Sequence, residues 1–217
     1  MGLAVPRHMP IRTAAGRAAS ALPVELLRAR RQADIIAVPR RRCLAIDGEG
    51  SPQGTDFQRA VPALFRAAYA LKFARKKTGG ADFKVGPLEG HWSADVKPGT
   101  RGRPAPERWV WRLRVAVPAD VSRAELAKLK KVLCEQKRDG AEDLARVYLE
   151  AIPAQRLGRI LHVGPYADEP QSLNAVDAVL RQAGLTAAPT HIEVYCKDPR
   201  RVRPAALETV LLRELAP

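Results

Sequence analysis

The chain has 217 residues, of which 46% are hydrophobic and 28% are charged, as in soluble globular proteins. This length is enough for a hydrophobic core that needs no disulfide or metal support. No run of about 18 or more apolar residues is present, which excludes a membrane-spanning helix. The N-terminus also lacks the apolar stretch of about 7–15 residues that a secretory signal requires.

The formal net charge is +14, and part of the excess lies in residues 1–33, where six arginines face the single acid Glu25. This segment has the composition of a basic, disordered tail, so we expect the folded domain to occupy residues 34–217. A basic surface raises non-specific affinity for polyanions but does not identify a specific partner. The high arginine and alanine content is equally compatible with a GC-rich coding sequence. We therefore expect no specific nucleic-acid partner.

The three cysteines are far apart and odd in number, which favours a reduced, cytoplasmic compartment over a disulfide framework. The four histidines never reach metal-ligand spacing with one another or with a cysteine, and the sequence has no glycine-rich phosphate loop. We expect no metal, no other cofactor and no membrane partner. The sequence selects no oligomeric state and is compatible with a monomer.

A strand–helix–strand–strand pattern occurs twice along the chain. The first copy predicts a strand over 43–50, a helix from 56 to about 76, and strands over about 84–93 and 108–117. The second copy predicts a strand over 159–166, a helix over about 170–183, and strands over 191–196 and 207–212. Short strands at 35–38 and 147–152 are each expected to form a hairpin with the copy that follows.

The residues between the two copies predict an amphipathic connecting helix, from 122 to about 145, with Gly140 as its expected breaking point. Pro62 is expected to kink or divide the first long helix. The sequence thus predicts an α+β protein. Its two βαββ halves lie at about 34–118 and 146–217, and a helical connector joins them at about 119–145.

The third strand of each copy carries one glutamate, and aligning residues 87–91 with 191–195 makes Glu89 the counterpart of Glu193. Alternate residues of a strand share a face, so Glu193 points with His191 and Tyr195, away from an apolar set that should pack on the helix. A carboxylate between two rings near an enclosed apolar surface suits a proton acceptor or an anchor for cations. An exposed edge glutamate without a role is the alternative.

Aromatic residues gather in the same strands and turns. Trp109 and Trp111 share parity with Leu113, so core packing is their first interpretation, and a position near a pocket is the second. Trp92 follows Gly90, which could form a bulge and change the face of the ring. Tyr166 follows a Gly-Pro turn that could present its phenol at the mouth of a cavity.

Six segments of the chain match a known family: CLAIDGEGSP, AYALKFARKK, FKVGPLEGHWSAD, WVWRLRVAVP, ILHVGPYADEP and HIEVYCKDPRRVRP. In this order, from about residue 43 to the end, they resemble the GyrI-like small-molecule-binding proteins. The resemblance implies two βαββ halves related by a pseudo-twofold axis, with helices on one side of a curved antiparallel sheet and a ligand groove on the other. It also implies a hydrophobic small molecule, often planar or cationic, as the partner.

The same segments look most like a stand-alone subfamily whose members hydrolyse cyclopropanoid DNA-alkylating natural products, in detoxification or self-resistance. The resemblance then implies that Glu193 orients or deprotonates the attacking water, and that Tyr166 or Tyr69 donates to the developing phenolate. Glu193 and Tyr166 are thus the expected catalytic residues. The residues expected to bind the ligand are Tyr69, Phe73, Glu89, Trp92, Trp111, His162 and Tyr195. Relatives often carry a bulky apolar residue at His91 and an aromatic residue at Ser93, so the departures here imply a more polar or more open pocket.

Two other functions are compatible with the sequence. A binding protein without catalysis, which sequesters a toxic or signalling ligand, would use the same pocket residues. Nucleic-acid binding or partnership with gyrase would depend on the positive charge, but the sequence shows no recognition helix and no stacking-sheet motif.

Overall fold

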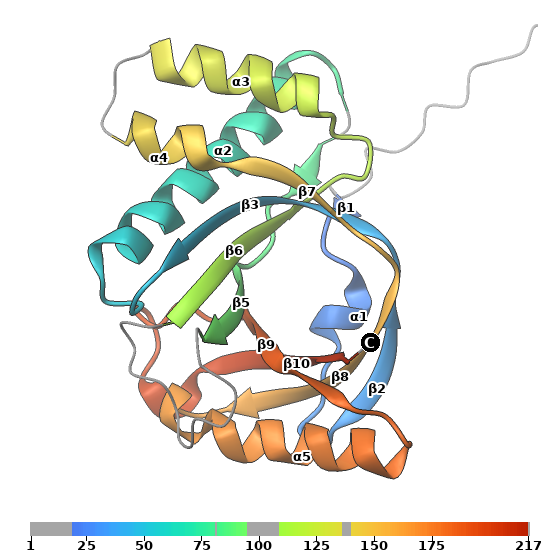
Figure 1. Cartoon of the computed structure of the whole chain (residues 1–217). Coiled ribbons are helices and arrows are strands. Elements are labelled where there is room, and N and C mark those ends of the chain that lie inside the picture. The colour runs from blue at the N-terminus through green and yellow to red at the C-terminus, as the bar shows by residue number, and fades with distance from the viewer. Residues whose placement is uncertain (1–18, 81, 95–108, 136–139, 217) are drawn as a thin grey trace, which may run out of the picture.

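The computed structural model describes residues 19–80, 82–94, 109–135 and 140–216, and its centre is an eight-stranded antiparallel sheet (Figure 1). From one edge to the other, the strands are β2 (Asp34–Val38), β8 (Gln155–Val163), β10 (Glu208–Leu215), β9 (Ala187–Tyr195), β5 (Glu89–Ala94), β6 (Trp109–Val117), β3 (Arg41–Glu49) and β7 (Tyr148–Ile152). A separate parallel pair consists of β1 (Ala19–Ser20) and β4 (Phe83–Lys84). The predicted α+β class is confirmed.

Both predicted βαββ units are present. β3, α2 (Thr55–Lys77), β5 and β6 form the first, and β8, α5 (Glu169–Gln182), β9 and β10 form the second. Their first strands end alike, because the amide of Gly50 donates to the carbonyl of Trp109 over 2.8 Å and that of Gly164 donates to Leu207 over 3.1 Å. Both glycines have positive φ angles, 90° and 144°, which residues with a Cβ rarely adopt. These matching registers place a pseudo-twofold axis between β5 and β9.

The short strand before each unit pairs with the other unit. β2 pairs with β8, and β7 pairs with β3, so the expected β2–β3 and β7–β8 hairpins are wrong. Only Pro39 and Arg40 separate β2 from β3, and only Pro153 and Ala154 separate β7 from β8. A two-residue hairpin loop favours glycine or asparagine at positive φ, and neither linker has them. Each segment therefore continues past its proline into the neighbouring unit, and the two units interlock.

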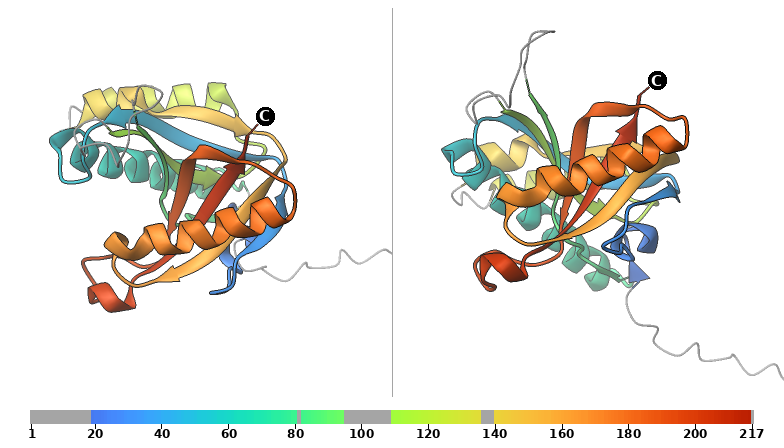
Figure 2. Two further views of the ribbon diagram at one scale, coloured as in Figure 1. Left: turned by 60° about the horizontal axis from the view of Figure 1, so that its bottom comes forward. Right: turned by 90° about the horizontal axis from the view of Figure 1, so that it is seen from below.

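Helices α2 and α5 cover one face of the sheet, which we call the helix face (Figure 1, Figure 2). Leu64 of α2 is buried in one cluster with Ile46 and Leu113 of the first unit. Val176 of α5 is buried in another cluster with Leu211 of the second unit. α3 (Arg123–Glu135) and α4 (Ala141–Arg146) pack against α2 and against each other, and α3 also contacts β7 at the edge of the sheet. Each unit therefore has its own apolar core on this face.

Pro62 does not break the long helix, whereas the connector between the two units is divided as predicted. α2 runs unbroken from Thr55 to Lys77, although Pro62 predicts a kink or a division. Pro62 and Gln58 are exposed, so the Gln58 carbonyl that loses its helical partner can be solvated. The connector does divide, and Gly140 precedes α4 with a φ of 81°. Within the described ranges, no helix has the length and hydropathy needed to cross a membrane.

The opposite face of the sheet, which we call the inner face, curls around α1 (Val24–Leu27) (Figure 1). Leu22 and Leu26 are 2% and 0% exposed there, in a cluster with Ile192. The Arg30 carbonyl accepts a hydrogen bond from the Leu161 amide over 2.7 Å. Residues 19–33 thus pack into the domain, in contrast to the expected tail over 1–33, because their leucines cover an apolar surface that water would otherwise contact. Residues 1–18 lie outside the described part.

The role of α1 can be tested with two neighbouring leucines. We expect Leu26→Ala to lower the free energy of unfolding by about 2–5 kcal/mol, because it removes a fully buried side chain. Leu27 is 40% exposed, so Leu27→Ala should cost less than about 1 kcal/mol. Urea unfolding followed by tryptophan fluorescence measures both values. Equally small losses in the two variants would mean that α1 adds nothing to the core.

Candidate functional site

A cavity of about 1020 Å³ opens on the helix face, lined by α2, by the start of α5 and by the strands between them. The resemblance implies a groove on the side opposite the helices, and the cavity is on the helix side instead. Side chains of β9 alternate, and Glu193 lies opposite Leu211, which packs under α5. Glu193 therefore points towards the helices. A cavity of this size accommodates a drug-sized ligand.

Aromatic rings form two walls of the cavity. Phe57 stacks on Trp92 with ring centroids 5.8 Å apart and an interplanar angle of 18°. Trp92 in turn meets Trp109 edge-on at 5.7 Å. On the other side, Tyr166 meets Tyr195 edge-on at 6.1 Å. Such rings offer flat apolar surfaces to a planar ligand and electron-rich faces to a cationic one.

A chain of hydrogen bonds crosses the floor of the cavity. The indole Nε1 of Trp92 donates to Oη of Tyr195 over 3.1 Å, and that hydroxyl donates to Oε2 of Glu193 over 2.6 Å. Oε1 of Glu193 lies 2.9 Å from Nε2 of His191. Burial and the charge of Glu193 raise the pKa of Tyr195 well above its usual value, so the phenol keeps its proton and remains a donor. The floor thus holds a buried carboxylate between two ring side chains.

A second carboxylate and a second phenol lie near the start of α5. Glu169 is 5% exposed and lines the cavity beside Tyr166, which is 37% exposed. Burial, followed by the charges of Glu169 and Glu193, raises the pKa of Tyr166 to about 12. This phenol is therefore neutral near pH 7 and can donate a hydrogen bond. In the described ranges, no group of three or more His, Cys, Asp or Glu side chains could hold a metal ion.

Glu89 is not the structural counterpart of Glu193. In the β5–β9 pairing, Gly90 lies opposite Glu193 and Glu89 lies opposite Val194. Residues directly opposed in an antiparallel pair point to the same face, so Glu89 points to the inner face. The expected equivalence is wrong by one residue, and a shift of one residue in a strand reverses the face of every side chain.

The lack of a side chain at Gly90 makes room for the hydrogen-bond chain. A Cβ at this position would lie 2.6 Å from Nε1 of Trp92 and 3.0 Å from Oη of Tyr195. β5 pairs with β6 in one continuous register from Glu89 to Ala94, so no bulge turns Trp92 away from the cavity.

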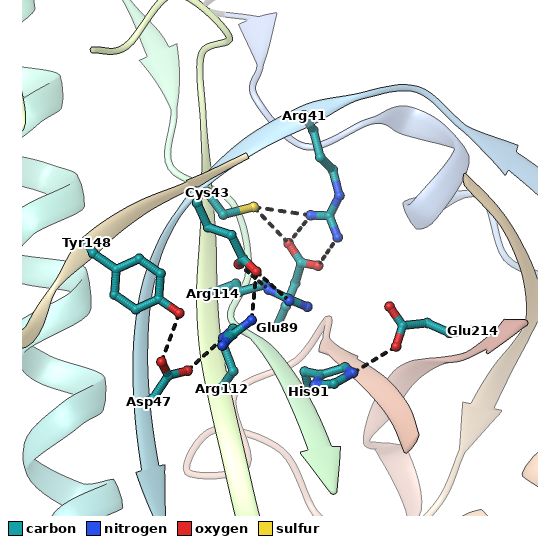
Figure 3. A network of polar contacts seen from close by, with 10 residues as sticks. Arg41, Cys43, Asp47, Glu89, His91, Arg112, Arg114, Tyr148 and Glu214 are labelled. Atoms are coloured by element: carbon teal, nitrogen blue, oxygen red, sulfur yellow. Dashed lines mark hydrogen bonds and ion pairs between the residues drawn. The ribbon is translucent and has the colours of Figure 1, made fainter. Parts of the chain in front are cut away.

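Glu89 forms a buried ion pair on the inner face (Figure 3). Its two carboxylate oxygens accept from Nη1 and Nη2 of Arg41 over 2.6 and 2.7 Å, and both side chains are at most 3% exposed. Sγ of Cys43 lies 3.3 Å from Nη1 of Arg41. Burial, and then the charge of Glu89, raises the pKa of this thiol, which keeps it protonated. This cluster contributes to the core and does not line the cavity on the helix face.

Other charged side chains of the inner face are also paired (Figure 3). Glu150 accepts from Nη1 of Arg112 over 2.9 Å and from Nε of Arg114 over 2.6 Å. Nε2 of His91 lies 2.8 Å from Oε2 of Glu214. Charged side chains named on this face therefore lie in ion pairs and not as isolated charges.

The predicted site residues divide into those that line the cavity and those that do not. The cavity brings together Glu193, Tyr166, Trp92 and Tyr195. Tyr69 and Phe73 lie further along α2, 47% and 58% exposed, with their rings stacked at 6.3 Å. They continue the line of Phe65, which does line the cavity.

Two further predicted ligand-binding residues are buried behind the cavity walls. Trp111 is 1% exposed and meets Phe57 edge-on at 5.3 Å, so it belongs to the core under α2. His162 fixes the turn before α5, because Nε2 lies 3.1 Å from the carbonyl oxygen of Pro165 and Nδ1 lies 3.0 Å from Oγ of Ser172. Its contribution to the cavity is therefore to hold the turn that carries Tyr166.

Sequence patterns do not identify several of the lining residues as part of the site: Phe57, Phe65, Trp109, Glu169 and His191. Strand alternation places His191 on the face of Glu193, and this signal could have identified it. Trp109 has the parity of Trp111, but it stands at the first residue of β6, where the cavity opens. Glu169 has no local signal, because only the folded position of α5 brings it to the cavity.

No protein-family model and no curated protein matches the sequence. Solved structures do match the fold. An uncharacterized conserved protein from Listeria innocua superposes with a TM-score of 0.80 and 28% sequence identity, over 89% of this chain and 96% of that chain. A hydrolase from Listeria innocua gives a TM-score of 0.78 and 27% identity over the same shares. The C-terminal domain of EcmrR gives 0.50 and 13% over 85% of this chain and 97% of that chain, a likeness of fold alone. These neighbours are consistent with a GyrI-like fold.

Glu89→Gln and Glu193→Gln test the assignment of the two faces. Glu89→Gln leaves the buried Arg41 without its counter-ion, so we expect the free energy of unfolding to fall by about 3–5 kcal/mol. Binding of ethidium, a planar aromatic cation, should stay within about twofold of the wild-type affinity, because the two sites lie on opposite faces.

Glu193→Gln should show the reverse, with weaker ethidium binding and a smaller loss of stability. Urea unfolding and quenching of tryptophan fluorescence measure the two quantities. Equal losses of ethidium affinity in the two variants would contradict the assignment of the faces.

Proposed function

We propose that this chain is a GyrI-like protein that binds hydrophobic, planar small molecules in the cavity between α2 and α5. The observation that carries the proposal is the buried carboxylate of Glu193, held by Tyr195 and His191 on the floor of an aromatic cavity. Aromatic walls bind a flat ligand by stacking, and the carboxylate orients a cationic or hydrogen-bond-donating group. The volume of about 1020 Å³ suits a ligand of several fused rings.

Hydrolysis of the bound compound is the second part of the proposal. A protein 27% identical over 89% of this chain is described as a hydrolase. The HIEVY and GPYADE segments resemble those of enzymes that open cyclopropanoid DNA-alkylating compounds. The substrate class is therefore an electrophilic cyclopropanoid, and its destruction serves detoxification or self-resistance.

The reaction adds one water to the substrate. The water oxygen attacks a cyclopropane carbon, the strained carbon–carbon bond breaks, and its electron pair moves through the conjugated dienone to the carbonyl oxygen. One proton of the water passes to a base in the cavity, and the new phenolate takes up a proton. The aromatic walls hold the flat electrophile beside the water and exclude other water. The neutral phenol of Tyr166 donates to the developing phenolate. Glu193 and its hydrogen-bond partners His191 and Tyr195 hold the attacking water.

A binding protein that sequesters the same compounds is the second candidate. Both carboxylate oxygens of Glu193 already have hydrogen-bond partners, which suits an anchor as well as a catalytic group. The two functions differ in the fate of the compound.

Incubation with a cyclopropanoid alkylating compound, followed by mass spectrometry, separates these functions. We expect the compound to gain the mass of one water. Glu193→Gln should slow this reaction about tenfold or more while the protein still binds the compound. Glu142 is 90% exposed at its side chain, so Glu142→Gln is the matched control and should hydrolyse at the wild-type rate. Unchanged compound recovered from the wild-type pocket would support sequestration and contradict hydrolysis.

A further inference from the structure

The hydrogen-bond chain in the cavity floor has a fixed direction. An indole nitrogen is a donor only, so Nε1 of Trp92 donates to the oxygen of Tyr195. The hydroxyl of Tyr195 then directs its single hydrogen to Oε2 of Glu193. An ionised carboxylate is an acceptor only, so Nε2 of His191 supplies the hydrogen for Oε1.

This arrangement selects the tautomer of His191. A neutral imidazole carries one N–H, and here it is on Nε2, which leaves the lone pair on Nδ1. Nδ1 has no hydrogen-bond partner among the described residues. The His191 side chain lines the cavity and is 19% exposed, against 10% for Glu193. The side chain that carries the lone pair is thus more exposed than the side chain of Glu193.

The neighbours of His191 leave this pairing undisturbed. On β10, Arg213 lies opposite His191, and its guanidinium is held by Asp177 at 2.9 and 3.1 Å. On β5, Trp92 lies opposite His191 and donates to Tyr195. The carboxylate of Glu193 is therefore positioned to stabilise a positive charge on the ring of His191.

We propose that His191 is the catalytic base of the pocket, with Nδ1 as the atom that accepts the water proton, and that Glu193 is a positioning residue that acts through Nε2. The inference rests on the proposed hydrolytic function and assigns its base. As the water oxygen bonds to the cyclopropane carbon, one water proton moves to Nδ1 and the ring-opened phenolate forms. The imidazolium, stabilised by Glu193, then loses that proton to the phenolate or to solvent, which regenerates the neutral ring.

His191→Ala and added imidazole test this assignment on the same cyclopropanoid compound. Loss of a general base lowers the rate by about 10²–10⁴-fold, and we expect His191→Ala to fall in this range. Imidazole in solution should then raise the rate of this variant at least about tenfold, because the truncated side chain leaves space in the cavity. Imidazole should not restore Glu193→Gln. The double variant should be no slower than His191→Ala, since the two residues act as a unit.

The chain offers a matched control for a histidine paired with a glutamate. His91 contacts Glu214 on the inner face, so His91→Ala should keep the wild-type rate, with or without imidazole. The second measurement needs no turnover: the nitrogen NMR shifts of His191 in the wild-type protein should show hydrogen on Nε2 and none on Nδ1.

Three results would overturn the inference and leave the proposed function in place. They are a His191→Ala rate close to that of the wild type, a lost rate that imidazole does not restore, and a hydrogen on Nδ1. If instead the wild-type protein binds the compound and never hydrolyses it, the proposed hydrolytic function fails and the assignment of a base fails with it.

Discussion

The antiparallel pairing of β5 with β9 joins the two halves of the molecule, and its register decides which side chains reach the cavity. It places Gly90 opposite Glu193 and Trp92 opposite His191, so that a small residue faces the carboxylate and a large ring faces the imidazole. The hydrogen bond between Trp92 and Tyr195 passes through the space that Gly90 leaves. The units are alike in backbone, but the cavity depends on the different side chains that the two strands place opposite each other.

The sheet carries a buried glutamate on each face, and the two differ in whether a cationic side chain neutralises their charge. Arg41 cancels the charge of Glu89 on the inner face, with two short hydrogen bonds in a site that water does not reach. The contacts of Glu193 are a phenol and an imidazole, so its charge stays available to whatever enters the cavity. A buried charge without a cationic partner is costly, and proteins keep such groups chiefly where function needs them. This contrast separates a structural carboxylate from a functional one more sharply than burial does.

Much of the fold follows from local sequence patterns, and much of the site does not. The duplicated βαββ order, the connector break near Gly140 and the shared face of His191, Glu193 and Tyr195 depend on spacing along one segment, so the sequence predicts them. The pairing of β2 with β8 and of β7 with β3 is set by how the halves dock, which no local pattern encodes.

The same distinction explains the site residues. The predicted equivalence of Glu89 with Glu193 is wrong because an alignment of short strands tolerates a shift of one residue, and a sheet does not. Glu169 reaches the cavity only because α5 packs across the second unit. Trp109 and Trp111 point to the same face of β6. Trp109 lines the cavity and Trp111 is buried in the core, and only the position of α2 over the sheet decides this difference.

The exchange of the edge strands also constrains how the chain can be made. β3 ends at Glu49, and β7, which pairs with its outer edge, begins only at Tyr148. β2 pairs with β8, which begins only at Gln155. During synthesis the N-terminal half therefore emerges from the ribosome with backbone N–H and C=O groups exposed along β3, the kind of edge that pairs with other chains. Neither half can complete its sheet alone, so folding proceeds as one late, cooperative event built on long-range pairings. The outer edge of β3 therefore stays unpaired until the second half of the chain has been translated, and exposed edges of this kind favour aggregation.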